Sequence, residues 1–138
     1  MIPAIQKTVG DSGPSGSIVV NSSVVADSKI APKSIGHSVY AASKAFVSSL
    51  VETVAVECAP RIRINSVKPG LILTSIFSLG DDSMASLGAK VQPLWGRAGY
   101  PHEVASLVAY LLSDEASMIS GTGVLVDGLW SKSGGTFG

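Results

Sequence analysis

The residues best suited to chemistry are a tyrosine and a lysine four positions apart, in the run Tyr40-Ala41-Ala42-Ser43-Lys44. Because residues four apart are neighbours on the surface of a helix, the Lys44 ammonium can lie beside the Tyr40 phenol. A nearby cation favours the charged form of a phenol, which is otherwise a poor base at neutral pH. The pair therefore predicts a group that exchanges a proton with an alcohol or carbonyl oxygen.

Two serines that follow a predicted strand are the best partners for this pair. Residues 17–22 form a β-branched run without polar alternation, which is typical of a strand buried on both faces in a parallel sheet. Because α/β proteins bind ligands at the carboxyl ends of such strands, the hydroxyl of Ser23 can reach the same crevice as Tyr40. Ser22 and Ser28 are alternatives for this role. Spacing alone also fits an ordinary helix-surface pair and turn-forming serines.

The elements that would position these residues alternate between strand and helix. We expect strands at residues 17–22, 62–67 and 124–126, and helices at residues 38–58, around 84–90 and from Pro101 onward. This alternation predicts an α/β fold in which right-handed crossovers join about three parallel strands with flanking helices. We expect a single domain over residues 1–138, in which residues 1–16 and 129–138 are loops or terminal segments.

The helix expected at residues 38–58 is apolar on two sides. No Gly or Pro interrupts it, and Ser38 can cap its start. One stripe is expected to face the core, and its members are Val39, Phe46, Leu50 and Val54, widened by Val47, Val51 and Cys58. The second apolar side holds Ala41, Ala45 and Val56. A helix of this kind packs in a large core or against a second chain.

The composition argues against several classes of function. Ten Lys and Arg balance ten Asp and Glu, so we expect neither nucleic acid nor an anionic membrane as a partner. The longest unbroken apolar runs, such as residues 107–112, are far shorter than the roughly 20 residues that cross a bilayer. The single cysteine, Cys58, forms no internal disulfide, and a cytoplasmic location is expected. His37 and His102 lack partners at ligand spacing, so no metal site is predicted.

Several segments, taken in chain order, resemble the landmarks of the short-chain dehydrogenase/reductase family. The matching segments are residues 17–23, 40–44, 63–74, 96–97, 101–105, 111–114 and 121–128. A lone Tyr-x-x-x-Lys is a weak signal, whereas ordered landmarks over nearly the whole chain are specific.

This resemblance implies an NAD(P)-dependent oxidoreductase that interconverts an alcohol and a carbonyl. In the catalytic roles that it implies, Ser23 holds the substrate oxygen and Tyr40 transfers the proton. Lys44 favours the ionised phenol and hydrogen-bonds the nicotinamide ribose, so Tyr40 and Lys44 also belong to the cofactor site.

The resemblance also implies a cofactor contact after the second strand. Ile72 and Thr74, which follow Pro69-Gly70, would contact the carboxamide of the nicotinamide ring. The glycine allows the backbone to approach a ligand closely, and the Thr74 hydroxyl offers a donor and an acceptor. Because the long helix of family members commonly packs against its twin, the resemblance implies a homo-oligomer that forms through helix 38–58.

The chain departs from the family pattern on its amino-terminal side. Family members begin with a strand, a Gly-rich turn and a helix that hold the pyrophosphate, followed by the residue that selects NAD or NADP. Gly10, Gly13 and Gly16 precede a strand and so do not meet this fingerprint. We therefore expect a partial, doubly wound Rossmann-like fold that lacks the amino-terminal cofactor-binding half, with NAD or NADP as cofactor. The alternative is a non-catalytic truncated remnant that acts as an oligomerising interaction module.

Overall fold

The computed structural model describes residues 16–27, 36–75 and 81–133 and contains the expected alternation of strands and helices. Its elements in chain order are β1 (Gly16–Asn21), the 3₁₀ turn η1 (Val24–Ala26), α2 (Ser38–Cys58), β2 (Ile62–Pro69), α3 (Asp81–Val91), α4 (Pro101–Leu112), the 3₁₀ turn η2 (Asp114–Ala116) and β3 (Gly123–Val126). Each predicted strand is present within two residues of its expected bounds, and α2 has the expected bounds. Ser28 lies outside the described residues, as do residues 1–15 and 134–138 of the predicted terminal segments 1–16 and 129–138, whereas Gly16 begins β1.

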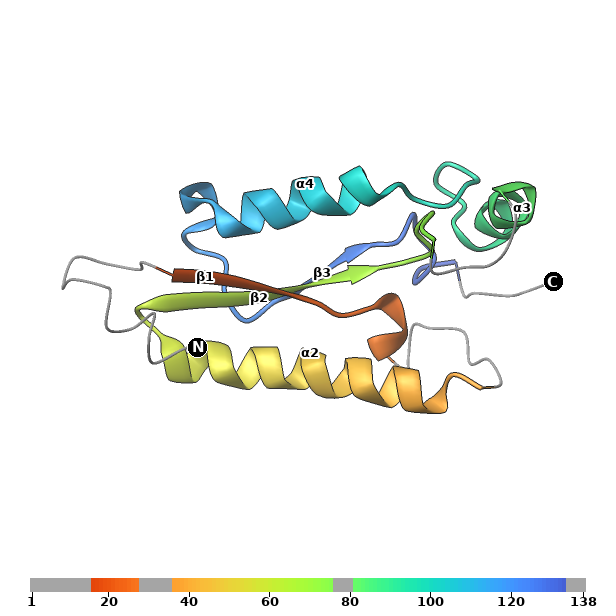
Figure 1. The fold of residues 1–138 in the computed structure, drawn as a ribbon. Helices are drawn as coiled ribbons and strands as arrows, with labels where there is room; N and C mark the ends of the chain where they lie inside the picture. The colour runs from red at the N-terminus through yellow and green to blue at the C-terminus, as the bar shows by residue number, and fades with distance from the viewer. Residues whose placement is uncertain (1–15, 28–35, 76–80, 134–138) are drawn as a thin grey trace.

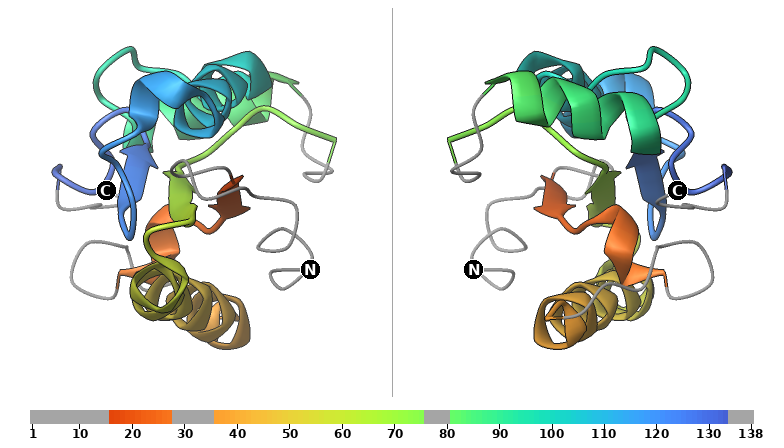
Figure 2. Two further views of the ribbon diagram at one scale, coloured as in Figure 1. Left: turned by 90° about the vertical axis from the view of Figure 1, so that its left-hand side faces the viewer. Right: turned by 90° about the vertical axis from the view of Figure 1, so that its right-hand side faces the viewer.

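Three parallel strands form one sheet in the order β1-β2-β3. The α/β class is therefore confirmed, with α2 on one face of the sheet and α4 on the other (Figures 1 and 2). Residues 62–67 of the central strand β2 are all buried. We expected β1 to be buried on both faces, but most of it is only half-buried because it lies at an edge of this sheet.

The carboxyl ends of the strands lie at the same end of the molecule as the first turns of α2 and α4 (right side of Figure 1). This arrangement follows from the topology, because each helix runs antiparallel to the strands that it connects. Residues at strand ends and at helix starts are thereby brought together, although they are far apart in the sequence.

The face of α2 that packs on the sheet is only partly the expected one. The buried residues of this helix are Ser48, Val51, Ala55 and Cys58, and the last three pack with Ile62 and Ile64 of β2. Of the expected core stripe, Val51 and Cys58 are buried as predicted, whereas Val39 and Phe46 are 81% and 66% exposed. On a helix that is apolar on two sides, periodicity does not select the buried face. The expected cap is also wrong, because the N-cap residue is His37 rather than Ser38.

By length and composition alone, α2 could cross a membrane. It has 21 residues and a mean hydropathy of 1.3, and it is the one helix among the described residues that meets this test. The core helices of many globular proteins meet the same test, and α2 packs on β2 along its buried stripe. The expected absence of a membrane partner stays a prediction.

A buried cation joins β2 to the end of α4. Arg63 is only 7% exposed. Its guanidinium donates to the backbone carbonyls of Leu111, Ser113 and Ile119 at 3.0, 2.9 and 3.3 Å. Carbonyls at the end of a helix lack intrahelical partners and carry partial negative charge. Arg63 therefore caps α4 and holds the connection between α4 and β3.

Replacing Arg63 with methionine should lower the free energy of unfolding by about 3 kcal/mol, because three buried or half-buried carbonyls lose their charged donor. Urea denaturation followed by circular dichroism measures the loss. The exposed Lys132→Met is the control and should change stability by no more than about 0.5 kcal/mol. Equal stability of the two variants would contradict the capping role of Arg63.

Candidate active site

A pocket of about 460 Å³ opens at the carboxyl end of the sheet. Its lining comes from the ends of β1 and β2, the loop that follows β2, and the starts of α2 and α4: Asn21, Ser22, Ser23, Tyr40, Lys44, Pro69, Gly70, Ile72, Thr74, Pro101 and Val104. Every site residue predicted from the sequence, apart from the alternative Ser28, therefore lies around one cavity. A ligand in this pocket would contact both strand ends and both helix starts at once.

Tyr40 and Lys44 lie one turn apart on α2, as their spacing predicts. The Lys44 ammonium is 5.7 Å from the centroid of the Tyr40 ring. It also donates a 2.9 Å hydrogen bond to the backbone carbonyl of Asn21, the last residue of β1. The Tyr40 side chain is exposed, so its hydroxyl is accessible to a molecule in the pocket. Lys44 thus joins α2, which carries Tyr40, to the end of β1, which is followed by Ser22 and Ser23.

The two described serine candidates have different hydrogen bonds. Ser22 donates to the backbone carbonyl of Lys44 at 3.1 Å, and its oxygen is 2.9 Å from the hydroxyl of Ser48. Among the described residues, Ser23 only accepts a hydrogen bond, at 3.3 Å from the Val25 amide, as the N-cap of η1. A hydroxyl has a single hydrogen. Ser22 already uses its hydrogen, whereas Ser23 keeps its own for a ligand.

The loop after β2 is fixed by backbone pairing with Gly99. The Gly99 amide donates to the Leu71 carbonyl and the Leu73 amide donates to the Gly99 carbonyl, both at 2.8 Å. Ile72, between these two leucines, forms an isolated parallel bridge with Gly99. Within the described part of the chain, the amide and carbonyl of Ile72 itself form no backbone hydrogen bond, and Ile72 lines the pocket.

Gly70 lines the pocket and is also required for packing within the protein. The expectation that its missing side chain lets a ligand approach the backbone stays a prediction. In the structure, a Cβ at Gly70 would collide with the amide oxygen of Gln92 and with Asp127. The space beside Gly70 is therefore filled by the protein itself, and the glycine is needed for internal packing.

Gln92, which the sequence analysis missed, attaches this loop to the segment after α3. It is buried, its side-chain oxygen accepts from the Leu71 amide, and its side-chain nitrogen donates to the Arg97 carbonyl at 2.9 Å. Its only sequence signal is a polar residue between the expected helix and Pro93. That signal does not reveal that Gln92 contacts Leu71, which lies 21 residues earlier in the loop after β2.

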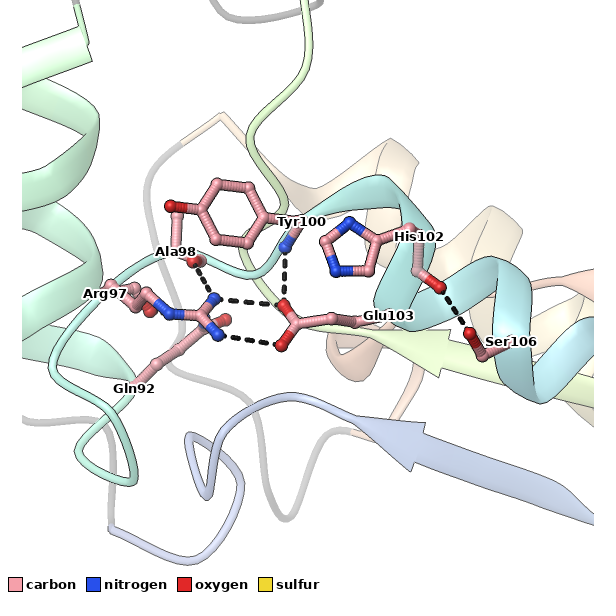
Figure 3. Close-up of polar contacts among 7 residues, drawn as sticks. All are labelled: Gln92, Arg97, Ala98, Tyr100, His102, Glu103 and Ser106. Carbon is pink, nitrogen blue, oxygen red and sulfur yellow. Dashed lines mark hydrogen bonds and ion pairs between the residues drawn. The ribbon is translucent and has the colours of Figure 1, made fainter.

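An ion pair stabilises the start of α4 next to this loop (Figure 3). Arg97 binds Glu103 through two hydrogen bonds of 3.0 and 2.8 Å, and the Tyr100 amide donates to the same carboxylate at 2.7 Å. The guanidinium also lies 4.6 Å from the centroid of the Tyr100 ring. These contacts hold residues 97–103 together, including Gly99, which pairs with the loop after β2.

The same contacts change the ionisation of both side chains. The hydrogen bond from Arg97, followed by that from the Tyr100 amide, lowers the pKa of Glu103 from 4.5 to about 2. The carboxylate in turn raises the pKa of Arg97. Both side chains are about one-third exposed, at 34% and 33%, so solvent and salt screen the pair.

Comparison with known proteins gives consistent matches. A protein-family profile described as enoyl-(acyl carrier protein) reductase matches residues 1–129. The chain is 41% identical over 96 residues to the NAD-dependent glycerol dehydrogenase of Listeria innocua, covering 67% of this chain and 37% of that protein. It is 38% identical over 130 residues to human dehydrogenase/reductase SDR family member 4, covering 93% of this chain and 44% of that protein.

This chain has the same fold as part of a longer protein of known structure. The complex of 7α-hydroxysteroid dehydrogenase with NADH and 7-oxo glycochenodeoxycholic acid matches with a TM-score of 0.71 and 30% identity, over 92% of this chain and 47% of that one. The chain thus spans less than half the length of the relatives that it matches.

Glu103→Gln should lower the free energy of unfolding at neutral pH. The difference in this free energy between the variant and the unsubstituted chain should shrink in acid. Because the pKa of Glu103 is about 2 in the folded chain and 4.5 ordinarily, its carboxylate stabilises the fold above about pH 4.5. That contribution is lost as the pH falls from 4.5 towards 2. Urea denaturation at several pH values measures the difference. Glu57→Gln, at an exposed position, is the control. A loss of unfolding free energy in Glu103→Gln that grows as the pH falls would contradict the ion-pair assignment.

Proposed function

The chain belongs to the short-chain dehydrogenase/reductase family, and from that premise we propose that it carries the catalytic half of an NAD(P)-dependent oxidoreductase that interconverts an alcohol and a carbonyl. The observation that best supports this proposal is the pocket that Ser23, Tyr40 and Lys44 share with residues of the loop after β2. Proton transfer and cofactor contact require these groups to face the same space.

Tyr40 is the proposed acid and base. In alcohol oxidation, the ionised phenol takes the hydroxyl proton of the substrate as the carbonyl forms, and in reduction the phenol returns a proton to the carbonyl oxygen. The Lys44 ammonium lies 5.7 Å from the centroid of the Tyr40 ring and so places a positive charge beside the phenol. Ser23 donates its hydroxyl hydrogen to the substrate oxygen, because its other hydrogen bond uses only its lone pair. The hydride of the reaction is carried by the nicotinamide ring when that cofactor is bound.

The donors around the pocket suit the nicotinamide end of NAD or NADP. The Lys44 ammonium matches ribose hydroxyls, which accept hydrogen bonds. The amide and carbonyl of Ile72 are not used by the Gly99 pairing, so they can bind the amide group of the ring, which both donates and accepts. Thr74 adds an exposed hydroxyl beside them, and Pro69 and Gly70 bring the loop to the pocket.

The exposed apolar side chains of α2 support a second candidate function, an oligomerising interaction module. Val39, Phe46 and Leu50 of one apolar side and Val56 of the other are all exposed on this helix. Large apolar side chains gathered on one element are typical of protein–protein interfaces. We therefore also propose a homo-oligomer that forms through α2.

From the charge balance and cysteine count, we propose a cytoplasmic location, with a small-molecule substrate and neither nucleic acid nor membrane as a partner.

Tyr40→Phe should lower turnover by on the order of 100- to 10,000-fold and leave NADH or NADPH binding within about twofold, because only the proton transfer is lost. Lys44→Met should weaken the binding of either cofactor as well. Fluorescence titration with NADH and NADPH measures binding, and oxidation of a panel of secondary alcohols measures turnover. Ser49→Ala, an exposed position on α2, is the control. Failure of the chain to bind either cofactor, or full turnover in Tyr40→Phe, would contradict the proposal.

Phe46→Glu combined with Leu50→Glu should shift the chain towards the monomer, because two charges would be buried at the proposed interface. Sedimentation velocity measures the change. Leu94→Glu introduces a charge at an exposed leucine outside α2 and should leave the oligomer intact. An unsubstituted chain that is monomeric at high concentration would exclude the interaction module.

A further inference from the structure

We propose that Ser48, acting through Ser22, is the positioning residue that holds Lys44 and Tyr40 at the end of β1. Ser48 is not among the residues that line the pocket, but its hydroxyl contacts Ser22, which is. The inference rests on the proposed roles of Tyr40 and Lys44, and it concerns how the helix that carries them is fixed against the strand that carries Ser23.

The apolar attachment of α2 to the sheet stops before the residues that would do chemistry. The hydrophobic cluster uses Val51, Ala55 and Cys58 of this helix. Ser48 is one turn nearer the amino end, and no residue of α2 before it is buried. At 1.5 Å per residue, Tyr40 lies roughly 16 Å along the helix from Val51. The position of this amino-terminal part must therefore be fixed by contacts other than that cluster.

Two consecutive residues of the β1 end bind Lys44 at two places. The Asn21 carbonyl accepts from the Lys44 side chain at 2.9 Å. The Ser22 hydroxyl donates to the Lys44 backbone carbonyl at 3.1 Å. The lysine is thereby held both at its backbone and at its charged end. The packing of η1 against α2 adds to this attachment, and the two bonds fix the direction of the Lys44 side chain.

Ser48 completes this attachment. Its oxygen is 2.9 Å from that of Ser22, and both serines are buried, at 8% and 3% exposed. Because the single hydrogen of Ser22 is used on the Lys44 carbonyl, Ser48 must be the donor in the contact between them. Ser48 therefore orients the Ser22 hydroxyl, and Ser22 holds the turn of α2 that runs from Lys44 to Ser48. Without Ser48, the Ser22 oxygen would be buried without its donor, which is unfavourable.

Ser48→Ala and Ser22→Ala test this inference, with Ser49→Ala as the matched control. All three replace serine with alanine, and positions 48 and 49 share the same gain in helix propensity. The first readout is the nuclear Overhauser effect between the Lys44 side-chain protons and the Tyr40 ring protons, assigned with Tyr40→Phe. We expect it to fall at least about twofold in Ser48→Ala and Ser22→Ala and to be unchanged in Ser49→Ala. This readout needs neither cofactor nor turnover.

The second readout is the affinity for NADH and NADPH, which should fall roughly 2- to 10-fold in Ser48→Ala. The double variant Ser22→Ala/Ser48→Ala removes both hydroxyls, so it should be nearly as stable as the unsubstituted chain yet still lose the Overhauser effect. An unchanged effect in the folded double variant would overturn the positioning role. The two proposals can fail separately. If the Overhauser effect falls in Ser48→Ala but the unsubstituted chain binds neither NADH nor NADPH, the positioning role is supported and the proposed function is refuted.

Discussion

The hydrogen bond from the Lys44 ammonium to the Asn21 carbonyl is the contact on which the rest of the pocket depends. It joins the start of α2 to the end of β1, and so joins the phenol of Tyr40 to the hydroxyl of Ser23. A hydrogen bond from a charged donor typically contributes about 1.5–3 kcal/mol, which is enough to orient one flexible side chain. The same ammonium lies 5.7 Å from the centroid of the Tyr40 ring, so one group both attaches the helix to the strand and places a positive charge near the phenol.

Much of the fold could be predicted because the local signals were unambiguous. The β-branched run before Ser22 favours a strand, and the segment from Ser38 to Cys58 contains neither Gly nor Pro. Parallel strands then require their carboxyl ends to meet at one edge. This constraint is why the sequence alone predicts Ser23, Tyr40 and the residues after Pro69 around one cavity.

The buried face of α2 and the packing of the β2 loop could not be predicted because they depend on distant partners. A helix with valines and a phenylalanine on one side and alanines on the other has no single apolar stripe. The side that is buried includes Ser48, and a buried serine is favourable only when its partner, here Ser22, is already in place. Likewise, the clash that makes Gly70 necessary involves Gln92 and Asp127, which are remote in sequence.

The two sides of the pocket are therefore held by different forces. The α2 side is attached by hydroxyl and ammonium hydrogen bonds next to a hydrophobic cluster. The opposite side is the loop after β2, whose described residues 70–75 form no helix or strand. It is held by Gln92 and, through Gly99, by the ion pair of Arg97 and Glu103. Neutral hydroxyls do not titrate near neutral pH, whereas an exposed ion pair weakens with acid and salt. Disturbing the ion pair should then loosen the Ile72 side while the Tyr40 side stays in place, so that the proposed contact of Ile72 with the nicotinamide amide and the proposed proton transfer by Tyr40 can be separated in the same chain.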